Sequence, residues 1–425
     1  MKQTEVGLIP DDWEVKRFDE LFSISTETVP LADINQRCYV GTENMLQDKK
    51  GVAENTIELK YQNVREYRKD DILISNIRPY LKKIWFADKD GGCSTDVLVF
   101  RKIRNTDNAN FLFKIVSDDR FFNIVNDNAV GTKMPRGDKN IIKQVLFAIP
   151  TDKEEQQRIA KALSDADALI STTEKLLQKK KNIKQGAMQE LLTGKKRLPG
   201  FAKSTRAKMT ELGEIPEDWE VKTLSEIFEF KQNNTFTRDC LNDSKGEYQN
   251  VHYGDVLIKY PSILDCSKET IPFINEGINV KFSKYGIVEG DIIIADTAED
   301  ETVGKAVEIY NLGNRKIVSG LHTFLCRKMT DDFAPKWLGY FMNQAIFHNQ
   351  LLPFITGTKV SAISRTAIQN VKVLIPSKEE QTAIANVLSS MDKEIETLNT
   401  KLEKYRNLKT AMMQQLLTGK IRLIK

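Results

Sequence analysis

Basic and aromatic side chains interleave in two parts of the chain, one before residue 150 and one after residue 211. Lysine and arginine neutralise phosphates, and the arginine fork can also hold the edge of a guanine. The pattern favours nucleic-acid contact, although runs of charge more often form a solvated surface. In the first part the candidate contacts are Arg65, Arg68, Arg78, Tyr80, Lys82, Lys83, Lys133 and Arg136. In the second part they are Arg238, Lys259, Lys305 and Lys359.

Motifs of catalysis are missing from the same sequence. A DNA adenine methyltransferase needs an Asn/Asp-Pro-Pro-aromatic loop for the flipped base, and Leu352-Pro353-Phe354 lacks the polar residue and the second proline. No Gly-x-x-x-x-Gly-Lys-Ser/Thr loop for nucleotide phosphates occurs. Acidic pairs such as Asp70-Asp71 and Glu299-Asp300 have the residue types of metal ligands, but carboxylates before or after strands more often serve turns. We therefore expect no catalytic residue and no metal site, with a hydrolase built on a carboxylate pair as an alternative.

Length and charge limit how such a protein could bind nucleic acid. The 425 residues are long enough for two to four domains, and 40% apolar residues are enough for real cores. The formal net charge of +4 is nearly balanced. Any nucleic-acid contact must therefore come from local basic patches rather than from bulk charge.

Cysteine and histidine usage argues against a zinc centre. The five cysteines are scattered, no Cys-x-x-Cys occurs, and only three histidines are present. An odd, scattered set of cysteines fits a reducing compartment. Met1–Gly7 has no apolar segment of a signal peptide, and no stretch approaches the roughly 18 apolar residues of a membrane span. We therefore expect a cytoplasmic protein.

Two long helices are expected to position the domains. From Ile384 to Leu416 apolar residues recur at alternating steps of four and three, which is the heptad seam of a helix packed on a partner helix. The same seam begins 225 residues earlier at Ile159, and its polar interruption at Lys409 falls on Lys184. Because one such helix cannot bury its stripe alone, we expect the two copies to pack on each other. The seam residues singled out are Ile159, Leu163, Ile170, Leu177, Ile384, Leu388, Met391, Ile395, Leu398, Leu402, Met412 and Leu416.

Both helices carry start and stop signals. Gly194 and Gly419 stand where a left-handed C-cap residue is wanted, and about 40 residues at roughly 1.5 Å each give a rod of about 60 Å. A capping box, in which two side chains of the first turn bond each other's backbone, is expected at both starts. The candidate pairs are Ser377 with Glu380, and Thr151 with Glu154 or Asp152 with Glu155.

The duplication extends beyond the helices to whole domains. The segment Gly7–Lys16 returns as Gly213–Lys222, and each copy ends in Leu-Leu-Thr-Gly. A period this long indicates duplicated domains rather than a solenoid. The expected boundaries are 1–150 for a first globular domain, 151–198 for its long helix, 199–210 for a linker, 211–375 for a second globular domain and 376–425 for the second long helix.

Between opening motif and helix the two copies diverge but keep a common skeleton. Asp71–Ser75 matches Asp291–Ala295, and each is an apolar run suited to a buried strand. Gly131-Thr-Lys133 matches Gly357-Thr-Lys359, and each is followed by a strand-like run into Ile-Pro. Each globular part is therefore predicted to be a mixed α/β domain. Helices are expected at 109–127 and 335–351.

Several short motifs recur in both halves in the same order. They are Ile9-Pro-Asp-Asp-Trp and Ile215-Pro-Glu-Asp-Trp, the segment Asp71–Pro79, the two Gly-Thr-Lys turns, the Glu-Gln openings at Gln156 and Gln381, and the Leu-Leu-Thr-Gly ends. In this duplicated order they resemble the specificity subunits of type I restriction-modification systems, the S or HsdS family. The resemblance spans nearly the full length, and the order of the motifs is more specific than any single one.

This resemblance implies two mixed α/β target recognition domains separated by two long antiparallel coiled-coil helices, with an internal pseudo-two-fold repeat. Each domain would read one half of a split, asymmetric double-stranded DNA target, and the coiled coil would set the spacer and dock two methyltransferase subunits. Restriction (motor-nuclease) subunits would join for cleavage. S-adenosylmethionine would be bound by the methyltransferase subunits, so no cofactor is expected in this chain. An alternative of another class is a coiled-coil scaffold protein without DNA readout.

One departure from the family pattern concerns the segment that follows the matched strands. Ser75–Pro79 reads Ser-x-Ile-Arg-Pro, whereas the second copy reads Ala-Asp-Thr-Ala-Glu from Ala295. A contact role for Arg78 is therefore not transferred to the second domain. Lys305 is the basic substitute that the sequence offers there.

Overall fold

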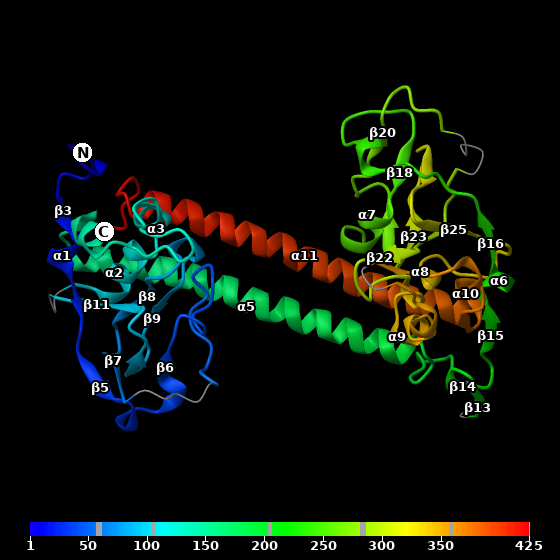
Figure 1. The fold of residues 1–425 in the computed structure, drawn as a ribbon, viewed down its shortest axis with the longest axis horizontal. Coiled ribbons are helices and arrows are strands. Elements are labelled where there is room, and N and C mark those ends of the chain that lie inside the picture. Colours follow the sequence, from blue (N-terminus) through cyan, green and yellow to red (C-terminus); the bar gives the residue numbers. More distant parts are fainter. Residues whose placement is uncertain (57–61, 104–106, 203–205, 281–285, 358–359, 425) are drawn as a thin grey trace. The chain divides into compact units, whose positions relative to one another are not determined.

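The computed structural model describes residues 1–425 except 57–61, 104–106, 203–205, 281–285, 358–359 and 425. The chain divides into unit 1, which is Met1–Lys175 with Asn399–Lys425, and unit 2, which is Leu176–Leu398. Both divisions fall inside the long helices α5 (Lys153–Leu191) and α11 (Lys378–Leu416) (Figure 1). Each unit therefore contains one globular domain and a part of both helices.

Unit 1 is built on a four-stranded antiparallel sheet in the order β4-β11-β8-β9. Its strand β8 is the apolar run Ile-Leu-Ile-Ser, all of it buried, as the run predicts. A second sheet has the order β5-β7-β10-β6. The strands are β4 Phe22–Ser25, β11 Val97–Lys102, β8 Ile72–Ser75, β9 Ile84–Phe86, β5 Thr28–Pro30, β7 Asn63–Tyr67, β10 Gly91–Cys93 and β6 Tyr39–Val40.

Short helices and two further strand pairs complete unit 1. The pairs are β1 (Lys2–Thr4) with β2 (Gly7–Ile9), and β3 (Trp13–Arg17) with β12 (Leu146–Pro150). The helices are α1 Phe18–Leu21, α2 Ala109–Val116, α3 Asp119–Asp127, α4 Lys139–Gln144 and the 3-10 turns Leu31–Asp33, Gln36–Cys38 and Pro79–Leu81, the last labelled η3.

Unit 2 repeats this plan with a five-stranded sheet in the order β16-β25-β21-β23-β19. Its second sheet has the order β17-β20-β18-β24, and three further pairs are β13 with β14, β15 with β27, and β22 with β26. The sheet strands are β16 Phe228–Lys231, β25 Thr323–Lys328, β21 Ile292–Ala295, β23 Ala306–Tyr310, β19 Ile263–Asp265, β17 Leu241–Asn242, β20 Phe273–Ile274, β18 Gln249–Val251 and β24 Ile317–Ser319. The paired strands are β13 Ala207–Thr210, β14 Gly213–Pro216, β15 Glu220–Thr223, β27 Lys372–Ile375, β22 Thr297–Ala298 and β26 Ser361–Ala362. The helices are α6 Leu224–Ile227, α7 Tyr253–Ile258, α8 Trp337–Phe341, α9 Ala345–His348, α10 Arg365–Gln369 and the 3-10 turns Arg238–Cys240 and Leu352–Phe354.

The mixed α/β prediction is confirmed, but each of the two predicted domain helices is broken in two. The 109–127 segment is interrupted at Asp118, whose carboxylate accepts from the Arg120 backbone and starts α3. The 335–351 segment forms α8 and α9. The apolar spacing continues across each break, so periodicity alone could not reveal it.

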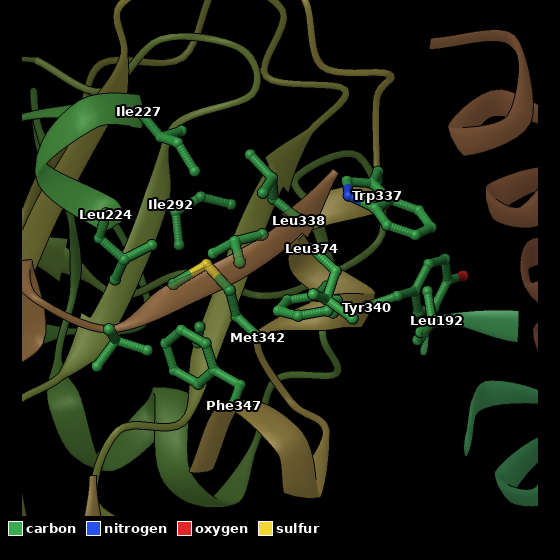
Figure 2. Packing of buried hydrophobic residues seen from close by; sticks show 14 of the residues in the cluster. Leu192, Leu224, Ile227, Ile292, Trp337, Leu338, Tyr340, Met342, Phe347 and Leu374 are labelled. Carbon is green, nitrogen blue, oxygen red and sulfur yellow. The ribbon is translucent and has the colours of Figure 1, made fainter. Parts of the chain in front are cut away.

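The core of unit 2 gathers apolar side chains from helices and strands that are far apart in sequence (Figure 2). Trp337, Leu338 and Tyr340 of α8 are at most 2% exposed, and they belong to the same cluster as Ile292 of β21 and Leu374 of β27. Burying each such side chain contributes roughly 1.5–3 kcal/mol to folding. This packing fixes β21, and with it the turn that follows β21.

The segment predicted as a linker, 199–210, is partly structured. Its last residues form β13, which pairs with β14 as β1 pairs with β2. The Thr210 hydroxyl donates to the Gly213 carbonyl at 2.8 Å, and Thr4 bonds Gly7 in the same way at 2.7 Å. The repeat therefore begins before the opening motif, and the linker prediction was wrong there because a short hairpin has no apolar periodicity to reveal it.

The helices α5 and α11 each have 39 residues, and both ends of α11 lie 225 residues after those of α5. Gly194 and Gly419 follow them with φ of 73° and 69°, as the C-cap signals predicted. Within unit 1 Asp167 pairs with Lys409 and Glu174 with Arg406. The partner number falls as the residue number rises, so the helices run antiparallel, as the resemblance implied.

Seam residues are buried to different degrees along the helices. Four seam residues are completely buried because they also contact the globular cores: Ile159, Leu163, Ile384 and Leu388. Leu177, Leu402 and Leu416 are buried as well, whereas Ile170, Met391, Ile395, Leu398 and Met412 are half-buried.

The two seam lysines are held by carboxylates. In unit 2 Lys184 pairs with Asp392 and lies 5.3 Å from the centre of the Tyr340 ring. In unit 1 the Asp167 carboxylate forms ion pairs with the ammonium groups of Lys409, at 2.5 Å, and Lys114, at 2.7 Å. Burial would raise the pKa of Asp167, but the two ammonium groups hold it below its usual value.

The first turn of each long helix departs from the predicted capping boxes. In unit 1 the Trp13 indole donates to Glu155 at 3.1 Å, and Arg422 binds both Glu155 and Asp12. We call this set the Trp-Glu-Arg cluster of unit 1. Unit 2 has the same cluster in Trp219, Glu380, Arg197 and Asp218.

The capping-box prediction was therefore wrong in its second half. Asp152 and Ser377 do accept backbone N–H groups of the first turns, at 2.9 and 3.4 Å. Glu155 and Glu380, however, are at most 1% exposed and bind tryptophan and arginine. The Thr151 hydroxyl donates to Asp12 instead of capping the helix.

Candidate nucleic-acid interface

The candidate site of each unit lies around its central strand, whose start is fixed by a buried ion pair. Asp71 precedes β8, and Arg101 of β11 binds both its oxygens at 2.8 to 3.2 Å. The Arg68 backbone N–H also donates to Asp71 at 2.8 Å. In unit 2 Asp291 and Arg327 repeat the pair. These carboxylates hold the fold together, which is not the role that the hydrolase alternative needs.

The turn after β8, residues 76–82, carries unusual backbone. Arg78 and Lys82 flank η3 and adopt left-handed conformations with φ of 52° and 48°. Such a conformation costs a side-chain-bearing residue roughly 1–2 kcal/mol. It persists where the surroundings over-determine it, and those places are commonly functional sites.

Hydrogen bonds with two other segments hold this turn. The Arg78 N–H donates to the Pro135 carbonyl at 2.8 Å, and Gly137 donates to Asn76 at 3.1 Å. Asn76 donates in turn to the Asp96 carbonyl at 2.9 Å. The turn 76–82 and the loop 130–137 are thus joined by hydrogen bonds into one surface, which we call the basic turn pair.

The basic turn pair exposes cationic and aromatic side chains. Arg78 and Lys133 are exposed, and Tyr80 is 52% exposed. Among the residues that the structure describes, these three have no side-chain hydrogen bond or ion pair. Arg136 binds Asp96 at 3.1 Å on the same surface. The sequence prediction therefore selected residues that do lie together here, although Asp96 was missed.

The other predicted contacts of unit 1 are engaged within the unit. Lys82 shares Asp119 with Lys49, at 2.7 and 2.8 Å, and Lys83 donates to the Thr42 carbonyl. Burial would raise the pKa of Asp119, but the two lysines hold it below its usual value. Arg65 donates to the Val97 carbonyl, and Arg68 pairs with Glu27 and Glu66.

Exposed ion pairs of this kind are weak, so Arg68 could exchange a carboxylate for a phosphate at little cost. Their role in binding remains a prediction.

In unit 2 the predicted basic residues are also engaged. Arg238 binds Asp255 through two hydrogen bonds, and Lys259 donates to the Thr270 carbonyl. Lys305 donates to the carbonyls of Leu257 and Tyr260, and burial lowers the pKa of Lys305. The structure therefore engages Lys305 inside the fold, and its role as a basic substitute for Arg78 stays a prediction. Lys359 lies outside the described residues.

The turn after β21 carries different chemistry from its counterpart in unit 1. Asp296 follows β21 as Asn76 follows β8, and its carboxylate accepts from Thr297 at 2.7 Å. His322, with φ of 53°, lies 3.3 Å from Asp296 and packs edge-on against Tyr253. The sequence selection missed Asp296 and His322 because it sought basic residues. Matching the two strand motifs residue by residue would have found Asp296.

The two units thus share one fold and differ in the side chains of the equivalent turn. The family model of the type I restriction modification DNA specificity domain matches the chain twice, over residues 10–185 and 216–404. The chain therefore belongs to this family and is the DNA specificity subunit of a type I restriction-modification system. It is a non-catalytic subunit that acts in a complex with DNA and other subunits.

Two known relatives match over nearly their whole length. The MjaVIII specificity subunit of Methanocaldococcus jannaschii is 27% identical over 424 residues, which are 97% of this chain and 94% of the relative. The putative MjaX specificity subunit of the same organism is 25% identical, covering 99% of this chain and 96% of the relative.

Solved structures share the fold. The type I S subunit from M. genitalium superposes with a TM-score of 0.57 at 15% identity, covering 98% of both chains. A chain from a structure on complex assembly and conformational transition of a type I system gives 0.55 at 18% identity, covering 97% of this chain and 100% of that one. Among the helices described here, none has the length and apolar character to cross a membrane.

Proposed function

We propose that each unit reads one half of a split, asymmetric DNA target, and that α5 and α11 set the spacer between the halves. The observation that carries this proposal is the pair of turns after β8 and β21. They follow equivalent strands, yet one exposes Arg78 and Tyr80, whereas the other places Asp296 beside His322, which precedes β25. Two unlike reading surfaces on one skeleton fit two unlike half-sites.

The partners follow from the same proposal. Two methyltransferase subunits dock on the coiled coil and bind S-adenosylmethionine, and restriction subunits join for cleavage. The assembly acts on DNA in the cytoplasm. A scaffold without DNA readout is not favoured, because both matches are to the DNA specificity domain.

The test is a domain exchange in the assembled complex. Residues 5–150 are replaced by the same region of a relative, the chain is co-expressed with its methyltransferase subunit in a methylation-free host, and modified adenines are mapped. One half of the motif should change while the other half and the spacer stay. The matched exchange of residues 211–375 should change only the other half. An unchanged motif in both exchanges would refute the proposal.

A further inference from the structure

We propose that Arg78 reads a guanine in the half-site of unit 1, while the neighbouring Lys133 binds a phosphate. This inference rests on the proposed function and adds which side chain carries base specificity. Among the described part of the chain, Arg78, Tyr80 and Lys133 are the predicted contacts of unit 1 whose side chains have no internal partner, so they can bind DNA without breaking an existing bond.

The backbone that carries Arg78 is held firmly enough for base readout. Base readout needs a side chain launched from a fixed position, whereas phosphate contact tolerates a flexible point charge. The backbone on both sides of Arg78 is fixed, because its own N–H binds Pro135 and Ile77 pairs with Arg136. The buried side chains of Ile77 and Pro79 anchor the turn from below.

The hydrogen-bond donors of Arg78 determine which base it can bind. The guanidinium of Arg78 has a planar fork of donors and no acceptor, which matches O6 and N7 of guanine in the major groove. Adenine presents a donor beside N7, and cytosine presents its amino donor, so neither can accept both N–H groups. The ammonium of Lys133 lacks this fork and suits a phosphate oxygen.

Unit 2 supplies the contrast. Its equivalent turn has Ala298 at the position of Arg78, where the side chain is buried and has no hydrogen-bond donor, and the nearby Asp296 carboxylate accepts a hydrogen bond from Thr297. Guanine reading of this kind is therefore confined to the half-site of unit 1. A change at Arg78 should leave the other half-site untouched.

The first experiment compares Arg78→Lys, Arg78→Gln and the matched control Lys133→Gln by methylation mapping of the co-expressed complex. Both Arg78 variants should relax one guanine position in one half-site, with discrimination falling roughly 5- to 150-fold. Lys133→Gln should lower methylation about equally at all sites, keep the motif and make the salt dependence shallower.

The second experiment changes the DNA, and its measurement on the wild-type complex does not depend on how the variants fold. In a series of duplexes, 7-deazaguanine, which lacks the N7 acceptor, replaces each guanine of that half-site in turn, including the guanine relaxed in the Arg78 variants. One such duplex should bind the wild-type complex about 10-fold more weakly. The same substitution should have little further effect on the Arg78→Gln complex.

Each result has one meaning. If both Arg78 variants lower methylation uniformly and keep every guanine, Arg78 is a phosphate contact and the inference is wrong. The inference is also wrong if no 7-deazaguanine position weakens wild-type binding. If the wild-type complex shows no split motif at all, the proposed function itself fails, which is a distinct outcome.

Discussion

At the residue scale, the ion pairs among the described residues divide into buried pairs that hold the fold and exposed pairs that can exchange partners. Asp71, Asp291, Glu155 and Glu380 are nearly inaccessible and bind arginine. Buried charges of this kind cannot lose a partner cheaply, because the remaining ion stays desolvated. Of the predicted contacts that the structure describes in unit 1, the side chains free to meet DNA are Arg78, Tyr80 and Lys133 at the basic turn pair.

Asp167 offers a pH-dependent test of such a pair. Its pKa is lower in the fold than in the unfolded chain, so its contribution is fully present above the unfolded value of 3.8 and is lost as pH falls through the folded value. Asp167→Asn should reduce the free energy of unfolding at pH 7 by on the order of 1–2 kcal/mol, a figure kept low because the side chain is 38% exposed.

Denaturant unfolding of the full chain at several pH values checks this. The difference between wild type and Asp167→Asn should shrink as pH falls below about 4. Asp165→Asn is the matched control, because Asp165 forms an exposed pair with Lys161 in the same helix and should matter little. A difference that stays constant down to strong acid would contradict the assignment.

At the element scale, the ends of the long helices matter as much as the seam. Gly194 ends α5 with φ of 73°, and a Cβ there would lie 2.6 Å from the Pro216 ring. Gly186 lies within the last two turns of the same helix, and a Cβ there would meet nothing within 4 Å. One glycine is therefore required by geometry and the other is not.

We expect opposite effects from the two alanine substitutions. Gly194→Ala should destabilise unit 2 by roughly 1–3 kcal/mol, through left-handed strain and the close approach to Pro216. Gly186→Ala should stabilise it by about 0.5–1 kcal/mol, because alanine is the better helix former. Thermal unfolding of the full chain measures both. A loss of stability in Gly186→Ala would show that the open space at that position is used by the fold.

Sequence reasoning predicted features that have a local cause and missed those whose cause lies far away in the chain. Strand β8 and the heptad seams were predictable because periodicity is a local property. The roles of Glu155 and Lys305 were not, because their partners Arg422 and Tyr260 are 267 and 45 residues away. A charged residue looks the same in sequence whether it faces solvent or a buried partner. The candidate interface could therefore be listed from sequence but not divided into free and occupied side chains.

At the scale of the whole molecule, the repeat makes two units that each close with an equivalent cluster. The carboxyl-terminal Arg422 completes unit 1, and Arg197, which follows α5, completes unit 2. Each arginine is drawn from the segment after one long helix and binds the start of the other. If the units are independent folding bodies, removing one arginine should loosen one unit alone.

Arg422→Ala should open unit 1 and spare unit 2, and Arg197→Ala should do the reverse. Glu155 is 0% exposed and would lose its charge partner, which typically costs about 3–5 kcal/mol, with Trp13 left as its donor. Hydrogen exchange of the full chain should report faster exchange in β3 and the start of α5 for Arg422→Ala. For Arg197→Ala the faster segments should be β15 and the start of α11. Equal loosening of both units by either variant would mean that the chain unfolds as one cooperative body, and that the two reading domains are coupled through the helices they share.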